Sequence, residues 1–317
     1  MALFFEPRRR PGGVHAELAE RDPYPNRFLD LGFYTFYITF MALSDLLTEN
    51  DLLILTQIVT PNLSDRRRAM RALREDDDIL EGMLKDQRIM RFLVDDPLSL
   101  LQISPGLFFL VLLSKVAGDM KTRPYTVEKQ SRFNTFVFDS DDVLSLLEDR
   151  AILEYLAAML LSFIRINTIS IPVRVRKGFW RKYHFSDFDI ENLIHYAQLV
   201  DEDHRFGPYK RIADVCLFIM GLFPEYVQSP ELFESASTSH LRQVSRRSRE
   251  ELTQTGARYY RAAAEHKTAR ELQLADVLEF LSNHIALLSK PLTVMAMSYL
   301  GLLKGQVFLG ADPGAGS

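Results

Sequence analysis

The sequence predicts a mainly α-helical fold, a multi-helix globular bundle around one buried central helix, with one small β-hairpin. Apolar residues recur at helical spacing through most of the chain, which indicates many amphipathic helices. Residues 212–223 are apolar on every side except for Asp214, and a helix of that kind belongs in a core. Only residues 171–185 have the alternation and the turn that are typical of paired strands.

The composition limits the classes of function. The chain has 317 residues, of which 47% are hydrophobic and 25% charged, as in an ordinary globular protein. A net charge of -4 gives no global attraction to nucleic acid or anionic lipid, so such binding would need a local basic patch. The single cysteine, Cys216, excludes an intrachain disulfide and fits a buried hydrophobe in a cytoplasmic protein.

The expected domain organisation is simple. Residues 1–26 combine proline, glycine and charge, which predicts a flexible N-terminal arm without the apolar segment of a secretory signal. Residues 27–305 are interpreted as a single helical domain, with 165–186 as an alternative internal boundary. Residues 306–317 are rich in glycine and alanine and are expected to be a disordered tail. No apolar stretch reaches the length of about twenty residues that a membrane span needs.

The N-terminal half shows several helical segments. Aromatic residues favour a helix over 28–40, with a strand as the alternative, and leucines at helical intervals predict a helix over 45–59. Ser64 is the expected N-cap of the next helix, and the helical periodicity continues to residue 94. Pro105 is expected to open a buried helix over 106–119, because proline is favoured in a first turn.

The segment 65–78 has the sequence DRRRAMRALREDDD and is the most densely charged part of the chain. Arg71 with Glu75, and Arg74 with Asp78, have the i,i+4 spacing of helical ion pairs. We interpret the segment as a solvated helix face, and the alternative is an exposed charged docking surface.

The middle of the chain contains the hairpin. Residues 136–138 fit a short strand, Asp139 or Ser140 is expected to cap a helix, and 150–164 has a clear apolar helical pattern. Residues 171–185 then read IPVRVRKGFWRKYHF, with valines alternating with arginines and the only tryptophan of the chain after the turn. The dipeptide at 177–178 supplies that turn, so these residues predict a β-hairpin.

The C-terminal half is expected to be helical. Residues 228–240 are rich in Ser, Glu and Thr and predict a mobile loop. The predicted helices cover residues 186–200, 211–223, 241–266 and 274–288, and Pro291 is expected to open a last helix that reaches about residue 304.

Two basic sets are candidate polyanion-binding residues. The hairpin carries Arg174, Arg176, Lys177, Arg181 and Lys182. The second set, Arg242, Arg246 and Arg249, has the spacing of a stripe on one helix. Cations presented together can meet phosphates, whereas the alternative is an exposed hairpin that its charges keep soluble.

Metal-ligand spacing gives a weaker candidate. Asp187, Glu191 and His195 lie at i, i+4 and i+8 on a predicted helix, and oxygen and imidazole ligands together suit several divalent metals. No HExxH and no pair of E-x-x-H elements accompanies them. Acidic and histidine side chains at helical spacing are otherwise common on a polar face.

Asp214 is the candidate catalytic residue, because an acid in an apolar helix must find a partner or become protonated. Arg211, Arg258, Arg261 or His284 could reach it. Asp276, Glu279 and Asn283 share a helix face that could complete a polar pocket. The catalytic candidates are therefore Asp214, His284 and Glu279, and a structural ion pair is the alternative.

The leading functional hypothesis is a non-catalytic intracellular binding or regulatory protein that contacts a protein or polyanionic partner through the basic hairpin. The first alternative is an enzyme with a polar pocket between helices around Asp214, with or without a metal. The second is a nucleic-acid-binding protein. The sequence contains no glycine-rich phosphate loop, GxSxG elbow or dinucleotide fingerprint, and it indicates neither a cofactor nor an oligomeric state.

Overall fold

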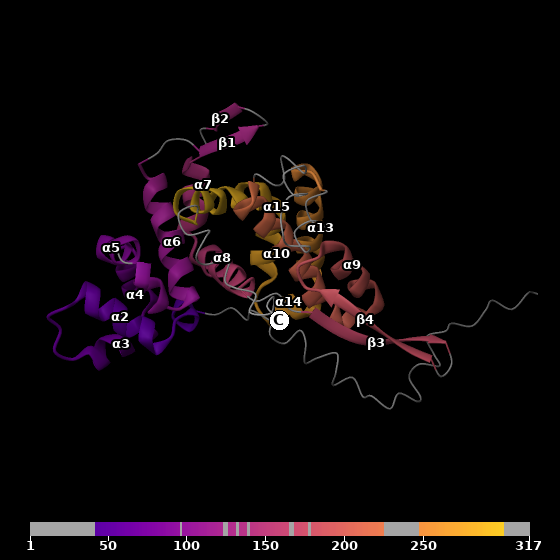
Figure 1. Ribbon diagram of the computed structural model, residues 1–317, viewed down its shortest axis with the longest axis horizontal. Coiled ribbons are helices and arrows are strands. Elements are labelled where there is room, and N and C mark those ends of the chain that lie inside the picture. The colour runs from indigo at the N-terminus through magenta and orange to yellow at the C-terminus, as the bar shows by residue number, and fades with distance from the viewer. Residues whose placement is uncertain are drawn as a thin grey trace, which may run out of the picture. The chain divides into compact units, whose positions relative to one another are not determined.

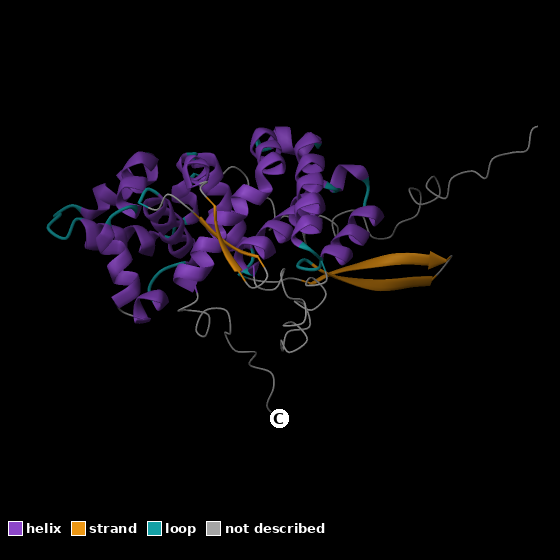
Figure 2. Ribbon diagram, turned by 90° about the horizontal axis from the view of Figure 1, so that it is seen from above, coloured by secondary structure: helices purple, strands orange, loops and turns teal. Residues whose placement is uncertain are grey.

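The computed structural model describes residues 42–95, 97–122, 126–130, 133–137, 140–164, 168–176, 179–224 and 247–300 (Figure 1). The chain divides into two units, Met1–Thr35 and Phe36–Ser317, and every described residue belongs to the second. The predicted arm, the helix over 28–40, the loop over 228–240 and the tail therefore lie outside the described residues. Helices make up most of the described chain, which confirms the mainly α fold (Figure 2).

The N-terminal helices are short. They comprise the 3-10 helix η2 (Leu43–Leu46), α2 (Glu49–Val59), α3 (Arg66–Glu75), α4 (Asp77–Leu84), α5 (Gln87–Asp95) and the 3-10 helix η3 (Pro97–Leu101). The continuous periodicity predicted to residue 94 is interrupted at Asp76, which has an extended backbone and whose carboxylate accepts the N–H groups of Asp78 and Ile79. The N-cap of α3 is Asp65 rather than Ser64, since the Asp65 carboxylate accepts the N–H of Arg68.

The middle of the chain contains α6 (Pro105–Met120), α7 (Ser140–Glu148) and α8 (Arg150–Ser162). Pro105 opens α6 as predicted, after the N-cap Ser104. The strand signal at residues 136–138 belongs to β2 (Phe133–Val137), which pairs antiparallel with β1 (Thr126–Gln130). The sequence of β1, TVEKQ, is mostly polar and has no alternation of apolar residues, so the sequence did not predict this second hairpin.

The hairpin predicted at residues 171–185 corresponds to β3 (Thr168–Arg176) and β4 (Phe179–Ser186). The strands pair antiparallel with Ile171 opposite Tyr183, and the two residues between them are those predicted to form the turn. The register shifts between Arg174 and Arg176, so β3 has one extra residue there, as in a β-bulge.

The C-terminal half surrounds α10 (Phe206–Leu222). It packs against α9 (Ile190–Leu199), α13 (Arg249–Glu265) and α15 (Ala275–Met295) (Figure 1). The shorter elements are the 3-10 helix η4 (Glu202–His204), α14 (Lys267–Glu271) and the π-helix η6 (Ala296–Leu300). Every residue of α10 except Tyr209 is buried, which confirms the predicted central helix.

The start of α10 differs from the prediction. The helix begins at Phe206, so Pro208 lies within its first turn, where the missing N–H removes no intrahelical bond. At the other end, Gly221 is the second-to-last residue of the helix. A Cβ atom at this position would lie 2.5 Å from the Cβ of Leu292 on α15, so glycine permits this close approach of the two helices.

The last long helix also differs. Pro291 does not open a new helix, because α15 continues through it to Met295. The irregular backbone of α15 is instead at His284, with φ −123° and ψ 16°. No helix in the described ranges has the length and apolar character needed to cross a membrane.

We expect Gly221→Ala to lower the free energy of unfolding by about 1–3 kcal/mol, because the added methyl group overpacks the contact with Leu292. The matched control is Gly82→Ala in α4, where an added Cβ meets no atom within 4 Å. That change should raise stability by up to about 1 kcal/mol through helix propensity. Urea denaturation of both variants tests this, and equal effects at the two positions would contradict it.

A buried charge centre and an exposed arginine face

The first candidate site is the carboxylate of Asp214, in the middle of α10. Its Oδ1 atom accepts hydrogen bonds from the hydroxyl groups of Tyr155 on α8, at 2.6 Å, and Tyr260 on α13, at 2.9 Å. Its Oδ2 atom accepts one from Nζ of Lys210, at 2.7 Å and one helical turn earlier. All four side chains are buried. Both oxygens of Asp214 are therefore engaged, and the negative charge has a direct counter-ion.

The two tyrosines are held as neutral phenols. Burial raises the pKa of Tyr155 and of Tyr260 well above the ordinary value, and the neighbouring charge of Asp214 acts in the same direction. The rings of Tyr155 and Tyr260 meet edge to face, and the ammonium group of Lys210 lies 4.7 Å from the centre of the Tyr155 ring. The arrangement is that of a satisfied structural network.

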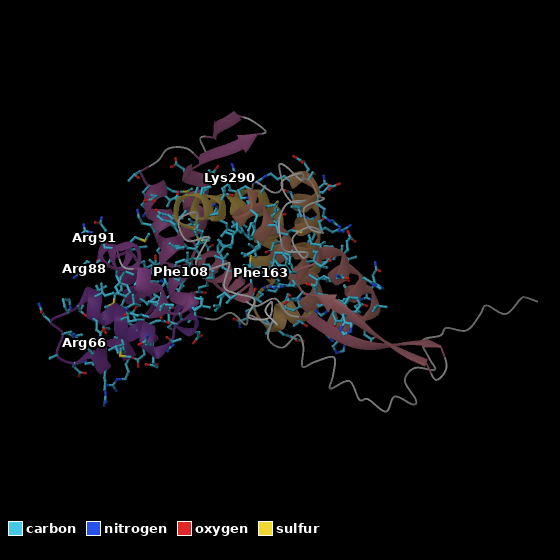
Figure 3. The ribbon with its side chains drawn as sticks, viewed as in Figure 1. Arg66, Arg88, Arg91, Phe108, Phe163 and Lys290 are labelled. Atoms are coloured by element: carbon cyan, nitrogen blue, oxygen red, sulfur yellow. The ribbon has the colours of Figure 1, made fainter. Side chains whose placement is uncertain are left out.

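Arg211 forms a second buried contact beside the first. Its Nε donates to the carbonyl oxygen of Asp187 at 2.9 Å, and Nη1 donates to Oγ of Ser162 at 2.8 Å. Nη2 lies 3.4 Å from the Asp187 carboxylate, and the guanidinium lies 3.8 Å from the centre of the Phe163 ring, which is among the packed helices in Figure 3. Burial lowers the pKa of Arg211, whereas the charge of Asp187 acts against this shift.

The side chains that donate hydrogen bonds to Asp214 are not the predicted ones, although the charge of Asp214 does act on Arg211. Arg211 directs its hydrogen bonds to Asp187 and Ser162, and the ring of His284 contacts the carbonyl oxygen of Phe280. Glu279 is exposed on α15, as are Asp276 and Asn283, so these residues do not complete a buried polar pocket around Asp214. Arg258 lies over the ring of Tyr259, and Arg261 donates to Asn283.

The candidate metal ligands are also separated. Asp187 precedes α9, because the N-cap of that helix is Asp189, and it is buried against Arg211. Glu191 is exposed and forms an ion pair with Arg247, while the ring of His195 meets that of Phe185 edge to face. No cluster of His, Cys, Asp or Glu suited to a metal ion occurs among the residues that the structure describes.

The polyanion-binding candidates lie mostly outside the described side chains. The backbone register places Val173 opposite Arg181 and Pro172 opposite Lys182, so the basic positions of both strands lie near the hairpin loop. Of the second set, only Arg249 is described, as the first residue of α13 after the N-cap Ser248, and Arg242 and Arg246 lie outside the described residues. The guanidinium of Arg249 donates to Oγ of Ser289 on α15.

The third site is the α3 arginine face, which consists of Arg67, Arg68 and Arg71. All three side chains are exposed, and no carboxylate of the described chain pairs with them. The arginines on either side have structural contacts. Arg66, labelled in Figure 3, donates to the carbonyl oxygen of Pro61.

Arg74, on the same helix, reaches Glu49 and the carbonyl oxygens of Ser44 and Leu47. The predicted pairing of Arg74 with Asp78 is therefore wrong. Asp78 instead pairs with Arg150 of α8. The arginine face is thus exposed, as both the predicted solvated helix face and its alternative, a charged docking surface, require.

No protein-family model matches this sequence, and neither a curated protein nor a solved structure matches it significantly.

We expect Asp214→Asn to destabilise the protein by about 3–5 kcal/mol, because it leaves the buried Lys210 without a counter-charge. Lys210→Met should have a cost of the same order. The double variant should cost clearly less than the sum of the two, since neither charge remains. A double-mutant cycle by urea denaturation tests this coupling, and strictly additive effects would contradict the description of the pair.

Proposed function

We propose that the protein is a non-catalytic binding or regulatory protein that contacts an acidic partner protein through basic surfaces. The observation that carries the proposal is the α3 arginine face, three exposed cations without a carboxylate partner in the described chain. The strongest catalytic candidate favours the same conclusion. The carboxylate of Asp214 is buried, and its two oxygens accept three hydrogen bonds from side chains of the protein itself.

The position of the arginine face has an electrostatic cost. Arg67 and Arg68 lie in the first turn of α3, which contains no acidic residue, and cations at a helix N-terminus oppose the helix dipole by about 0.3–1 kcal/mol each. Arg71 follows Arg67 by four residues, or about 6 Å along the axis. An acidic segment bound here would neutralise three clustered charges and relieve that cost.

The surroundings favour a protein over a nucleic acid. Glu75, Asp76 and Asp78 follow directly at the end of α3 and are exposed, so they would repel a continuous phosphate backbone. Leu63, which precedes the helix, is 39% exposed and offers an apolar contact. The β3–β4 hairpin, with its basic positions near the loop, is a second contact in this proposal.

The proposal includes the compartment in which the protein is located. A chain with a single cysteine, Cys216, needs no oxidising compartment. We place the protein in the cytoplasm on that basis.

The test measures fluorescence anisotropy of a labelled peptide rich in Glu, Asp and Leu, titrated with the protein at increasing salt. The parent should bind, and its affinity should fall as salt screens the exposed charges. The triple variant Arg67→Gln, Arg68→Gln, Arg71→Gln should bind at least about tenfold more weakly, which corresponds to about 1.4 kcal/mol.

The matched control removes three other exposed cations and so changes the net charge equally. It is the variant Arg91→Gln, Arg261→Gln, Arg270→Gln, whose positions are exposed on α5, α13 and α14. This control should retain the parent's affinity. Equal losses of affinity in the two triple variants, or no peptide binding by the parent, would contradict the proposal that the α3 arginine face binds the peptide.

The role of the hairpin is tested separately by Arg174→Ser, Arg176→Ser, Lys177→Ser, Arg181→Ser in one variant. If the hairpin contributes, this variant should weaken peptide binding and reduce its salt dependence, because fewer cations take part. A labelled single-stranded DNA is the comparison probe. Preference for DNA over the peptide would replace the acidic protein by a nucleic acid as the partner.

A further inference from the structure

The carboxylate of Glu154, on α8, lies where α8, η2 and α4 meet. The residue is only 6% exposed, and its Oε2 atom is buried without a hydrogen-bond partner in the described chain. The backbone N–H of Leu43, at the start of η2, favours the ionised form of this carboxylate. Glu154 is thus held between helices but is incompletely satisfied, in contrast to Asp214.

The groups around Glu154 are mostly acidic. Asp77, the first residue of α4, has its own Oδ1 atom buried without a partner. Asp149 precedes α8 as its N-cap. Arg150 favours ionisation of Glu154, and this cation is also engaged with Asp78 and Glu81 of α4. A negative charge on Glu154 would therefore be buried and would face Asp77 and Asp149, and Arg150 and the N–H of Leu43 offset this only in part.

We propose that Glu154 is a proton-sensing group that lets η2 and α4 pack against α8 when it is neutral and loosens this contact when it is ionised. Burial first, and the charge of Asp77 second, raise the pKa of Glu154 to about 7 from an ordinary value of 4.5. The change of state then falls in a physiological range of pH. The inference is independent of the proposed function, because it concerns a contact inside the protein.

The sign of the pH effect follows from linkage. Between pH 4.5 and about 7 the folded protein retains a proton on Glu154 that the unfolded chain has released. The contribution of Glu154 to the free energy of unfolding is therefore present at low pH, and it is lost as the pH rises through about 7. Ion pairs lower the pKa of Glu81 and Asp86, so these carboxylates stabilise the folded protein more as the pH rises. The contribution of Glu154 is therefore measured as the difference in stability between the parent and a variant.

The experiment compares thermal unfolding of the parent with that of Glu154→Gln from pH 5 to pH 8. Glutamine copies the neutral acid, so the two proteins should be similar at pH 5. At pH 8 the variant should be the more stable, and the difference in Tm should grow by at least about 2 °C. Glu75→Gln, at an exposed position on α3, is the control and should show a constant difference.

Hydrogen exchange locates the effect. In the parent, the amides of η2 and α4 should lose about tenfold or more of their protection between pH 6 and pH 8, after correction for intrinsic exchange. The protection of the α13 amides should not change. Asp77→Asn removes the neighbouring charge and should move the transition to lower pH. It serves as the second variant if Glu154→Gln does not fold. A flat difference in Tm across this range, or loss of protection spread equally over α13, would overturn the proposal.

Discussion

The constraint on which the structure depends is the burial of four charged side chains at α10. Lys210, Arg211 and Asp214 lie on this helix, and Asp187 packs against it, each with at most 3% of its surface exposed. Removing an ion from water costs several kcal/mol even after relaxation, so each charge must be paired and hydrogen-bonded inside the protein. The two cations and two carboxylates balance, and the contacts that balance them come from other elements.

Those contacts determine how the neighbouring helices are oriented. Tyr155 and Ser162 are seven residues apart, so both lie on the side of α8 that faces α10, where they bind Asp214 and Arg211. Tyr260 brings α13 to the same carboxylate. Apolar burial around α10 is large but non-directional. We infer that the polar contacts select one rotation of each helix about its axis, which is a role in conformational specificity.

The sequence was sufficient to predict the burial of α10 because that segment has no polar face. It also showed that Asp214 needs a partner, but it did not show which one. Lys210 and Arg211 differ by about 100° around the helix, so one reaches Asp214 and the other reaches Asp187. Both tyrosines come from distant segments and carry no local signal. The proposed metal ligands failed for a similar reason, because Asp187 lies before the helix on which its spacing was counted.

Asp214 and Glu154 show how environment divides two buried acids. Three donors surround Asp214, whereas one oxygen of Glu154 has none, so the first is a fixed part of the core and the second responds to pH.

The central claim is that α10, with its charges satisfied, is the most protected element. Native-state hydrogen exchange measures this directly. The amides of residues 212–222 should exchange only through global unfolding, and exchange as fast as that of the exposed helix α3 would contradict the account.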